Sequence, residues 1–243
     1  MTEPRLDSVT AAQMAEIDRA LEESIGLPLA SSVEIAGYHI ANHIQKLLEP
    51  IKGKHLLTLV GSGHNGADAL STTRHLVRLG ANAVILLDNA RSNLKPTTIQ
   101  QLEIAEQYGV RVFEPGALLP EADLIIDGLI GYGLEGSILQ EATRELIFAS
   151  AQYKVPHIAI DIPSGLDATT GRATTPAFRA DYTITLGYPK TGLVKQYSPA
   201  LVGELLVLDV GIPSRWWQRY DLTSPDFSAQ PIIVVPAVVL ANT

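Results

Sequence analysis

A short apolar strand that breaks into a glycine-rich turn and then into a helix is the feature that most constrains the fold of this chain. The strand covers residues 56–60, and Gly61, Gly63 and Gly66 follow it with the spacing G-x-G-x-x-G. Glycines at such a turn let the backbone come close to a ligand, and the N–H groups at the start of the next helix attract anions. The segment predicts a nucleotide or phosphate site, and leaves open whether that site serves redox chemistry.

Further apolar runs and helical segments alternate along the chain. Strands are predicted at residues 83–87, 110–113, 124–127, 157–161, 182–186 and 204–209. Helices are predicted at residues 67–79, 99–108 and 141–152. Capping-box patterns at residues 10–13 and 31–34 predict two more helices before the first strand. We therefore expect an α/β protein, with a three-layer α/β/α, Rossmann-like fold and a mostly parallel central sheet.

The length and composition suit one domain with a large core. Of the 243 residues, 46% are hydrophobic and 18% are charged. We expect a single domain over residues 1–243, with N-terminal helices at about 10–48, a sheet core at about 55–213 and a tail at about 214–243. The apolar part of the tail, residues 231–240, is expected to form an extended strand or an arm that packs on a neighbour.

Several classes of function are disfavoured by the same composition. The formal charge of −8, without clustered lysine and arginine, argues against nucleic-acid binding. No cysteine is present, so a bound metal needs oxygen or imidazole ligands. The N-terminus lacks the pattern of a secretory signal, and no apolar run approaches the length of a membrane span. We expect a cytoplasmic protein that does not associate with membranes.

Three predicted strands end on aspartates, which are Asp88, Asp127 and Asp161. In a parallel sheet these ends meet at one edge, where ligands bind. A loop rich in glycine follows Asp127, and a Pro-Ser-Gly turn follows Asp161. Asn65, Asp127 and Ser164 offer only oxygen ligands, which suit an alkali or alkaline-earth cation.

Other polar residues have simpler interpretations. Lys190 follows a predicted strand and is interpreted as a solvated loop lysine, with contact to a ligand phosphate as the alternative. His39 and His43 lie in the predicted second helix, away from the sheet edge, and are interpreted as partly buried or surface residues. Asp68 lies one turn into the helix after the glycine turn, where it either complements the helix dipole or faces the ligand.

Four ordered motifs resemble those of the NAD(P)H-hydrate epimerase family, the YjeF N-terminal domain family. They are GSGHNGADA at residues 61–69, where the family has G-x-G-N-N-G-G-D-G, DGLIGYG at 127–133, DIPSGLD at 161–167 and LGYPKTGL at 186–193. The resemblance covers roughly residues 10–213. Several ordered motifs are far more specific than a single G-x-G-x-x-G.

The resemblance implies an isomerase, usually a homodimer, that interconverts the R and S forms of NADHX and NADPHX, the hydrated forms of NADH and NADPH. A separate dehydratase would act on the S form, since the chain is too short for a fused one. Asp161 would be the acid/base, and Asn65, Asp127 and Ser164 would hold one potassium ion per subunit. The substrate-binding residues would be His64, Asn65, Gly66, Ala67, Asp68, Gly131, Tyr132, Gly133, Leu134, Glu135, Gly136, Ser137 and Asp161.

The first motif departs from the family pattern at three positions. His64 stands in place of an asparagine, and Ala67 and Ala69 stand in place of glycines. A methyl group at Ala67 would restrict the backbone if that position needed a positive φ. The departures keep open a catalytically silent family member that binds a nucleotide or a protein partner.

A third interpretation is an NAD-dependent dehydrogenase. Asp88 lies about 22 residues beyond Gly66, near the spacing expected for an acid that binds the cofactor ribose. This interpretation leaves the glycine loop after Asp127 and the turn after Asp161 without a role. The epimerase is therefore the preferred interpretation.

Overall fold

The centre of the protein is a single twisted sheet, seen in a computed structural model that describes residues 7–134, 139–195 and 199–235. Its strands are β1 (His55–Val60), β2 (Asn82–Leu87), β3 (Arg111–Phe113), β4 (Leu124–Gly128), β5 (His157–Ile160), β6 (Tyr182–Leu186), β7 (Glu204–Leu208) and β8 (Ile232–Val234). They are ordered β3-β2-β1-β4-β5-β6-β7-β8. The first seven strands pair in parallel, and β8 runs antiparallel to β7.

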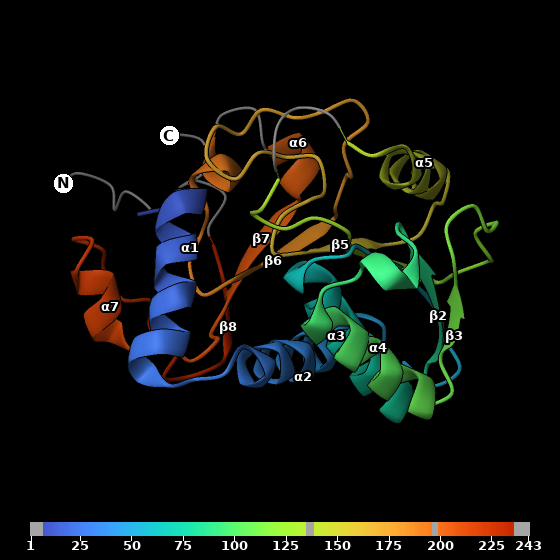
Figure 1. Ribbon diagram of the computed structural model, residues 1–243, viewed down its shortest axis with the longest axis horizontal. Coiled ribbons are helices and arrows are strands. Elements are labelled where there is room, and N and C mark those ends of the chain that lie inside the picture. The colour runs from blue at the N-terminus through green and yellow to red at the C-terminus, as the bar shows by residue number, and fades with distance from the viewer. Residues whose placement is uncertain (1–6, 135–138, 196–198, 236–243) are drawn as a thin grey trace.

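Helices cover both faces of the sheet (Figure 1). They are α1 (Ala11–Ala20), α2 (Leu29–Leu47), α3 (His64–Arg78), α4 (Pro96–Gln107), α5 (Glu141–Ser150), α6 (Pro199–Val202) and α7 (Ser214–Gln218). Short helical turns are η1 (Leu21–Ile25), η2 (Arg91–Asn93) and η3 (Thr191–Val194). Helices α2, α3 and α4 lie on one face, and α5 and α6 on the other.

The alternation of side chains along β1 explains the two layers of core. Leu56 and Val60 pack with α1, α2, α3 and α4, whereas Leu57 and Leu59 pack with α5. Successive residues of a strand point to opposite faces, so a strand covered on both sides is apolar throughout. The predicted three-layer α/β/α fold with a mostly parallel sheet is confirmed.

The strand predictions are confirmed to within one residue at each end, but two helices begin earlier than predicted. Helix α3 begins at His64, directly after its N-cap Gly63, and α4 begins at Pro96. Their first turns contain polar residues, which apolar periodicity does not detect, and proline is favoured in a first turn because its missing N–H needs no partner there. The extended strand predicted in the apolar tail, residues 231–240, is confirmed at β8, and residues 236–240 lie outside the described residues.

Only one of the two predicted capping boxes is present. The Thr10 hydroxyl accepts a hydrogen bond from the N–H of Gln13, whose side chain accepts one from Thr10 N–H. The prediction at Ser31 is wrong, because α2 already begins at Leu29 and Ser31 N–H donates to Pro28 at 2.8 Å. The N-cap is Pro28, three residues before the predicted one.

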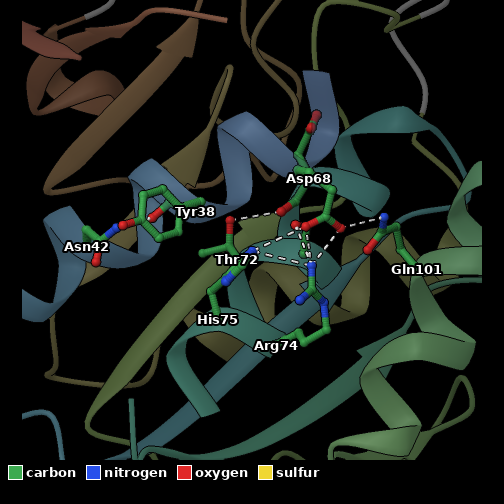
Figure 2. A network of polar contacts seen from close by, with 9 residues as sticks. Tyr38, Asn42, Asp68, Thr72, Arg74, His75 and Gln101 are labelled. Atoms are coloured by element: carbon green, nitrogen blue, oxygen red, sulfur yellow. Dashed lines mark hydrogen bonds and ion pairs between the residues drawn. The ribbon is translucent and has the colours of Figure 1, made fainter. Parts of the chain in front are cut away.

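Glu34 instead joins three helices on this face of the sheet. Its carboxylate pairs with the buried guanidinium of Arg74 on α3 and accepts a hydrogen bond from Gln101 on α4 at 3.0 Å. His75 lies beside the pair, with its Nε2 3.3 Å from Glu34 Oε2 (Figure 2). The network holds α2 and α4 against α3, the helix that starts at the glycine turn.

His39 and His43 are half-buried on α2, as predicted. Among the residues that the structure describes, none of the helices combines the length and apolar character that crossing a bilayer requires.

Candidate active site

The order of the strands reverses between β1 and β4, and a cavity of about 760 Å³ lies there. In an open parallel sheet, the loops after two such strands diverge and leave a crevice at their carboxyl ends. The cavity has the size of a small-molecule site. Eight of the predicted substrate-binding residues line it: His64, Asn65, Asp68, Gly131, Tyr132, Gly133, Leu134 and Asp161.

The other predicted substrate-binding residues are placed differently. Gly66 and Ala67 are buried in α3 and do not line the cavity. Glu135, Gly136 and Ser137 lie outside the described residues.

The glycines of the first turn allow loops of the protein to pack closely. A Cβ atom on Gly61 would lie 1.8 Å from the carbonyl oxygen of Leu129, and one on Gly66 would lie 2.1 Å from that of Gly61. The loop after β1 therefore packs directly on the loop after β4. Gly63 is the N-cap of α3 and makes no side-chain cap, and the start of this helix lines the cavity.

Asp161, directly after β5, lies in the cavity wall. Its φ of 65° is in the left-handed region, which is rare for a non-glycine residue and is found at functional sites. Oδ1 accepts hydrogen bonds from Thr185 Oγ1 at 3.2 Å and Leu186 N–H at 3.3 Å, and Oδ2 accepts one from Tyr132 N–H at 3.2 Å. The end of β6 fixes one carboxylate oxygen, and the loop after β4 fixes the other.

Lys190 is the ion-pair partner of Asp161, so its interpretation as a solvated loop lysine is wrong. The residue is 1% exposed. Its ammonium group donates to Asp161 Oδ1, to Leu186 O at 2.7 Å and to Thr185 Oγ1 at 3.2 Å. The chain turns sharply at Gly187 (φ 73°) after β6, and this turn directs the lysine back toward the sheet edge.

Asp127 and Ser164 form a second buried pair behind the cavity wall. Ser164 donates to Asp127 through its hydroxyl at 2.6 Å and through its N–H at 2.7 Å. The N–H of Ile130 donates to the Ser164 hydroxyl at 2.9 Å. Burial raises the pKa of Asp127 to about 6, although the hydrogen bonds from Ser164 oppose the shift. The pair joins the end of β4 to the Pro-Ser-Gly turn after β5, and neither residue lines the cavity.

Asn65 has a buried side-chain amide whose nitrogen and oxygen both lack a hydrogen-bond partner. A Cβ atom on Gly131 would lie 3.3 Å from Asn65 Cγ and 2.9 Å from Asp161 Oδ2. The amide and the catalytic candidate Asp161 therefore flank the same glycine. Buried amides are almost always paired, so this amide is available to bind a ligand in the cavity.

Two more aspartates, Asp68 and Asp18, line the cavity. Asp68 on α3 is buried, and the pKa of its carboxyl group is raised well above the usual range by burial and by the charges of Asp161 and Asp18. Asp18 on α1 accepts a hydrogen bond from the Tyr132 hydroxyl at 2.6 Å. Burial raises the pKa of Asp18, although Tyr132 and Lys190 oppose this. The described residues contain no group of three or more His, Asp or Glu side chains arranged to hold a metal.

Residues 30–192 match the family described as YjeF-related protein N-terminus. The chain belongs to this family. An NAD(P)H-hydrate epimerase of Leuconostoc gelidum is 36% identical over 220 residues, which cover 90% of this chain and 93% of the relative. A bifunctional NAD(P)H-hydrate repair enzyme Nnr of Moorella thermoacetica is 30% identical over 217 residues, which cover 85% of this chain and 41% of the relative.

The crystal structure of the yeast protein YNL200c has the same fold. It superposes with a TM-score of 0.81 and covers 95% of this chain and 100% of the yeast chain, at 23% identity. This similarity supports the three-layer α/β/α fold described above.

Two departures from the YjeF-related motif can now be placed. Ala67 lies inside α3 and is not among the described non-glycine residues with positive φ, which are Asp161 and Asp221. The position does not need a positive φ, so the methyl group of Ala67 does not restrict the backbone. His64 is exposed at the cavity, where its side chain is available to a ligand.

Sequence reasoning missed two features of the site. One is Asp18, and the other is the burial of Lys190 beside Asp161. A lysine four residues beyond the end of a parallel strand, next to a strand that ends on aspartate, was a usable signal for the ion pair. Asp18 lies in a helix before the first strand and carries no such signal. Only the tertiary packing of α1 brings it to the cavity.

Proposed function

We propose that this chain is an NAD(P)H-hydrate epimerase, an isomerase that interconverts the R and S forms of NADHX and NADPHX. Relatives that span most of the chain carry that name. The observation that carries the proposal is the buried pair of Asp161 and Lys190 in the wall of a cavity at the strand-order switch. The pair places an acid/base group where a parallel sheet binds its ligand.

The proposed chemistry needs one transferable proton and no hydride. The substrate carbon to be inverted carries a hydroxyl group beside a ring nitrogen. A proton held by the Asp161–Lys190 pair passes to this hydroxyl, the C–O bond breaks, and the nitrogen electron pair forms a C=N bond, giving an iminium ion and water. Water adds to either face of the iminium ion and returns its proton to Asp161, which regenerates the site.

Residues around the pair bind and orient the substrate in this proposal. The open N-terminus of α3, from Gly63 to Asn65, is suited to the negative charge of the substrate phosphates. Asp68 and the loop 131–134 form the adjoining walls, and we propose that they contact the nicotinamide half. The retained Asp161 and Lys190 favour an active enzyme over a catalytically silent member of the family.

A potassium ion held by Asn65, Asp127 and Ser164, one per subunit, is part of the proposal. Their oxygen atoms are hard ligands that suit this ion, and the unpaired amide of Asn65 is the observation that supports it. When bound, the ion would supply positive potential to a substrate phosphate or a departing hydroxyl group. Thermal unfolding in potassium chloride and in tetramethylammonium chloride at equal ionic strength tests the site. Potassium should raise the Tm of the wild type, and Asn65→Ala should remove the difference.

The partners follow from the reaction. We propose that an NAD(P)HX dehydratase consumes the S form, because two relatives, which this chain matches over 41% and 40% of their length, are named bifunctional NAD(P)H-hydrate repair enzymes. A homodimer and a cytoplasmic location complete the proposal, the latter in keeping with a chain that has no cysteine.

The test of the proposed function is the rate of epimer exchange. Purified R-NADPHX and R-NADHX are incubated with the protein, and the two epimers are separated by chromatography over time. We expect the protein to accelerate the appearance of the S form; exchange at the spontaneous rate for both substrates would contradict the proposal. A spectrophotometric screen for NADH formation with small alcohols and hydroxy acids tests the dehydrogenase alternative, for which we expect no signal.

A further inference from the structure

Tyr132 connects helix α1 to the acid/base group through two hydrogen bonds. Its hydroxyl group donates to Asp18 Oδ2 at 2.6 Å, and its backbone N–H donates to Asp161 Oδ2 at 3.2 Å. Its ring also lies 6.0 Å from Lys190 Nζ. One residue therefore spans the distance from a helix that precedes the first strand to the centre of the site.

The loop that carries Tyr132 needs such an anchor. Tyr132 lies between Gly131 and Gly133, and glycine has more backbone freedom than any other residue. Among the described residues, Asp18 is the hydrogen-bond partner of the Tyr132 hydroxyl group, and Tyr132 is the hydrogen-bond partner of the Asp18 carboxylate. A hydrogen bond to a charged carboxylate is about twice as strong as one between neutral groups. The contact thus opposes the freedom of the two glycines.

The same N-terminal segment also fixes the backbone around Lys190. Val9 N–H donates to Pro189 O at 2.9 Å, and Thr191 N–H donates to Val9 O at 2.8 Å. These two bonds flank the lysine on both sides. Helix α1 and the residues before it therefore hold both partners of the ion pair, Lys190 through the backbone and Asp161 through Tyr132.

We propose that Asp18 is a positioning residue of the site. By accepting a hydrogen bond from the Tyr132 hydroxyl group, it holds the loop 131–133 in the position in which the Tyr132 N–H donates to Asp161 Oδ2. The catalytic part of this inference rests on the proposed epimerase function, whereas the mechanical part does not. Burial and the nearby carboxylates raise the pKa of Tyr132 far above its usual range, so its hydroxyl group remains a donor.

Three variants test whether the hydrogen bond between Tyr132 and Asp18 positions the loop, or whether either side chain acts in another way. Asp18→Asn keeps an oxygen that can accept the hydrogen bond, whereas Asp18→Ala and Tyr132→Phe each remove it. Glu23→Gln is the matched control, because Glu23 is exposed on η1, just after α1, and does not line the cavity. Thermal unfolding shows that each variant is folded, and Tyr132→Phe, which deletes one oxygen atom, remains informative if Asp18→Ala unfolds.

Two measurements are made on each variant. Amide hydrogen exchange of a peptide that covers residues 129–134 reports on the loop, and epimer exchange gives kcat and KM. In Asp18→Ala and Tyr132→Phe we expect faster amide exchange and a kcat lowered about tenfold or more, because small displacements at a reacting group are costly. Asp18→Asn should retain kcat within about threefold and keep the amides protected, and Glu23→Gln should match the wild type in both measurements.

Each alternative outcome is informative. Unchanged amide exchange in Asp18→Ala and Tyr132→Phe overturns the inference. A large loss of kcat in Asp18→Asn with an active Tyr132→Phe also overturns it, because Asp18 would then act on the substrate directly. If the wild type itself shows no epimer exchange, the proposed function fails, while the amide exchange of the variants still decides whether Asp18 holds the loop.

Discussion

The ammonium group of Lys190 and the carboxylate of Asp161 form an ion pair that is almost completely buried, with 1% and 4% of the two residues exposed. The residues follow adjacent strands, β6 and β5, whose register pairs Ile160 with Ile184. Removing one charge of a buried pair leaves the other unpaired in a poorly solvated place, whereas removing both does not. Single and double variants of the pair should therefore differ in stability.

We expect Lys190→Met to lower the free energy of unfolding by about 3 kcal/mol or more, because Asp161 loses its buried counter-ion. Adding Asp161→Asn to this variant should restore most of the stability but none of the epimerase activity. Urea denaturation measures the stability, and Lys154→Met, at an exposed lysine, is the control. Equal stability of Lys190→Met and the control would contradict the buried pair.

Asp161→Asn alone should reduce epimer exchange to the spontaneous rate, and it should lower the stability because Lys190 loses its counter-ion, but the fold is expected to be retained. Asparagine has the shape of aspartate, tolerates a positive φ and keeps an oxygen for Thr185, but it cannot exchange a proton with the substrate. Near-UV circular dichroism checks the fold. The control is Asp167→Asn, outside the cavity, where the side chain accepts hydrogen bonds from Thr169 and Thr170 through one oxygen. Residual catalysis by Asp161→Asn would assign the acid/base role to another group.

The parallel sheet explains why much of the site was predictable. Strand ends are marked by local apolar runs, and parallel topology brings these ends to one edge, so the position of Asp161 in the cavity wall was predictable from the sequence, whereas Asp127 lies behind that wall. The burial of Lys190 depends on a turn at Gly187 and on hydrogen bonds to Val9, which are non-local. The glycine turn was predicted to approach a ligand; at Gly61 the close neighbour is instead the backbone of Leu129.

Changing the first motif toward the family pattern should have different effects at its two positions. His64 faces the cavity, so His64→Asn should raise or preserve the rate of epimer exchange. Ala67 is buried inside α3, so Ala67→Gly should preserve the rate but lower the free energy of unfolding by about 1 kcal/mol. Kinetics and urea denaturation of the two single variants check this. Loss of substrate binding in His64→Asn would indicate that this chain is specialised for another ligand.

Asp68 should make the stability of the protein depend on pH. Burial, helped by the charges of Asp161 and Asp18, raises the pKa of its carboxyl group in the folded state, whereas in the unfolded chain an aspartate ionises near pH 4. The folded state holds its proton to higher pH than the unfolded state, so this group contributes most stability below about pH 4 and loses it as the pH rises toward the folded-state pKa. The side chain of Asp68→Asn cannot ionise.

The free energy of unfolding of Asp68→Asn, relative to the wild type, should therefore increase between pH 5 and pH 8. Urea denaturation at several pH values in this range measures the difference. Asp123→Asn is the control: the N–H of His55 lowers the pKa of Asp123, so that group is ionised in both states throughout the range and its substitution should have a constant effect. A pH-independent difference for Asp68→Asn would mean that Asp68 is ionised in the folded protein throughout this range.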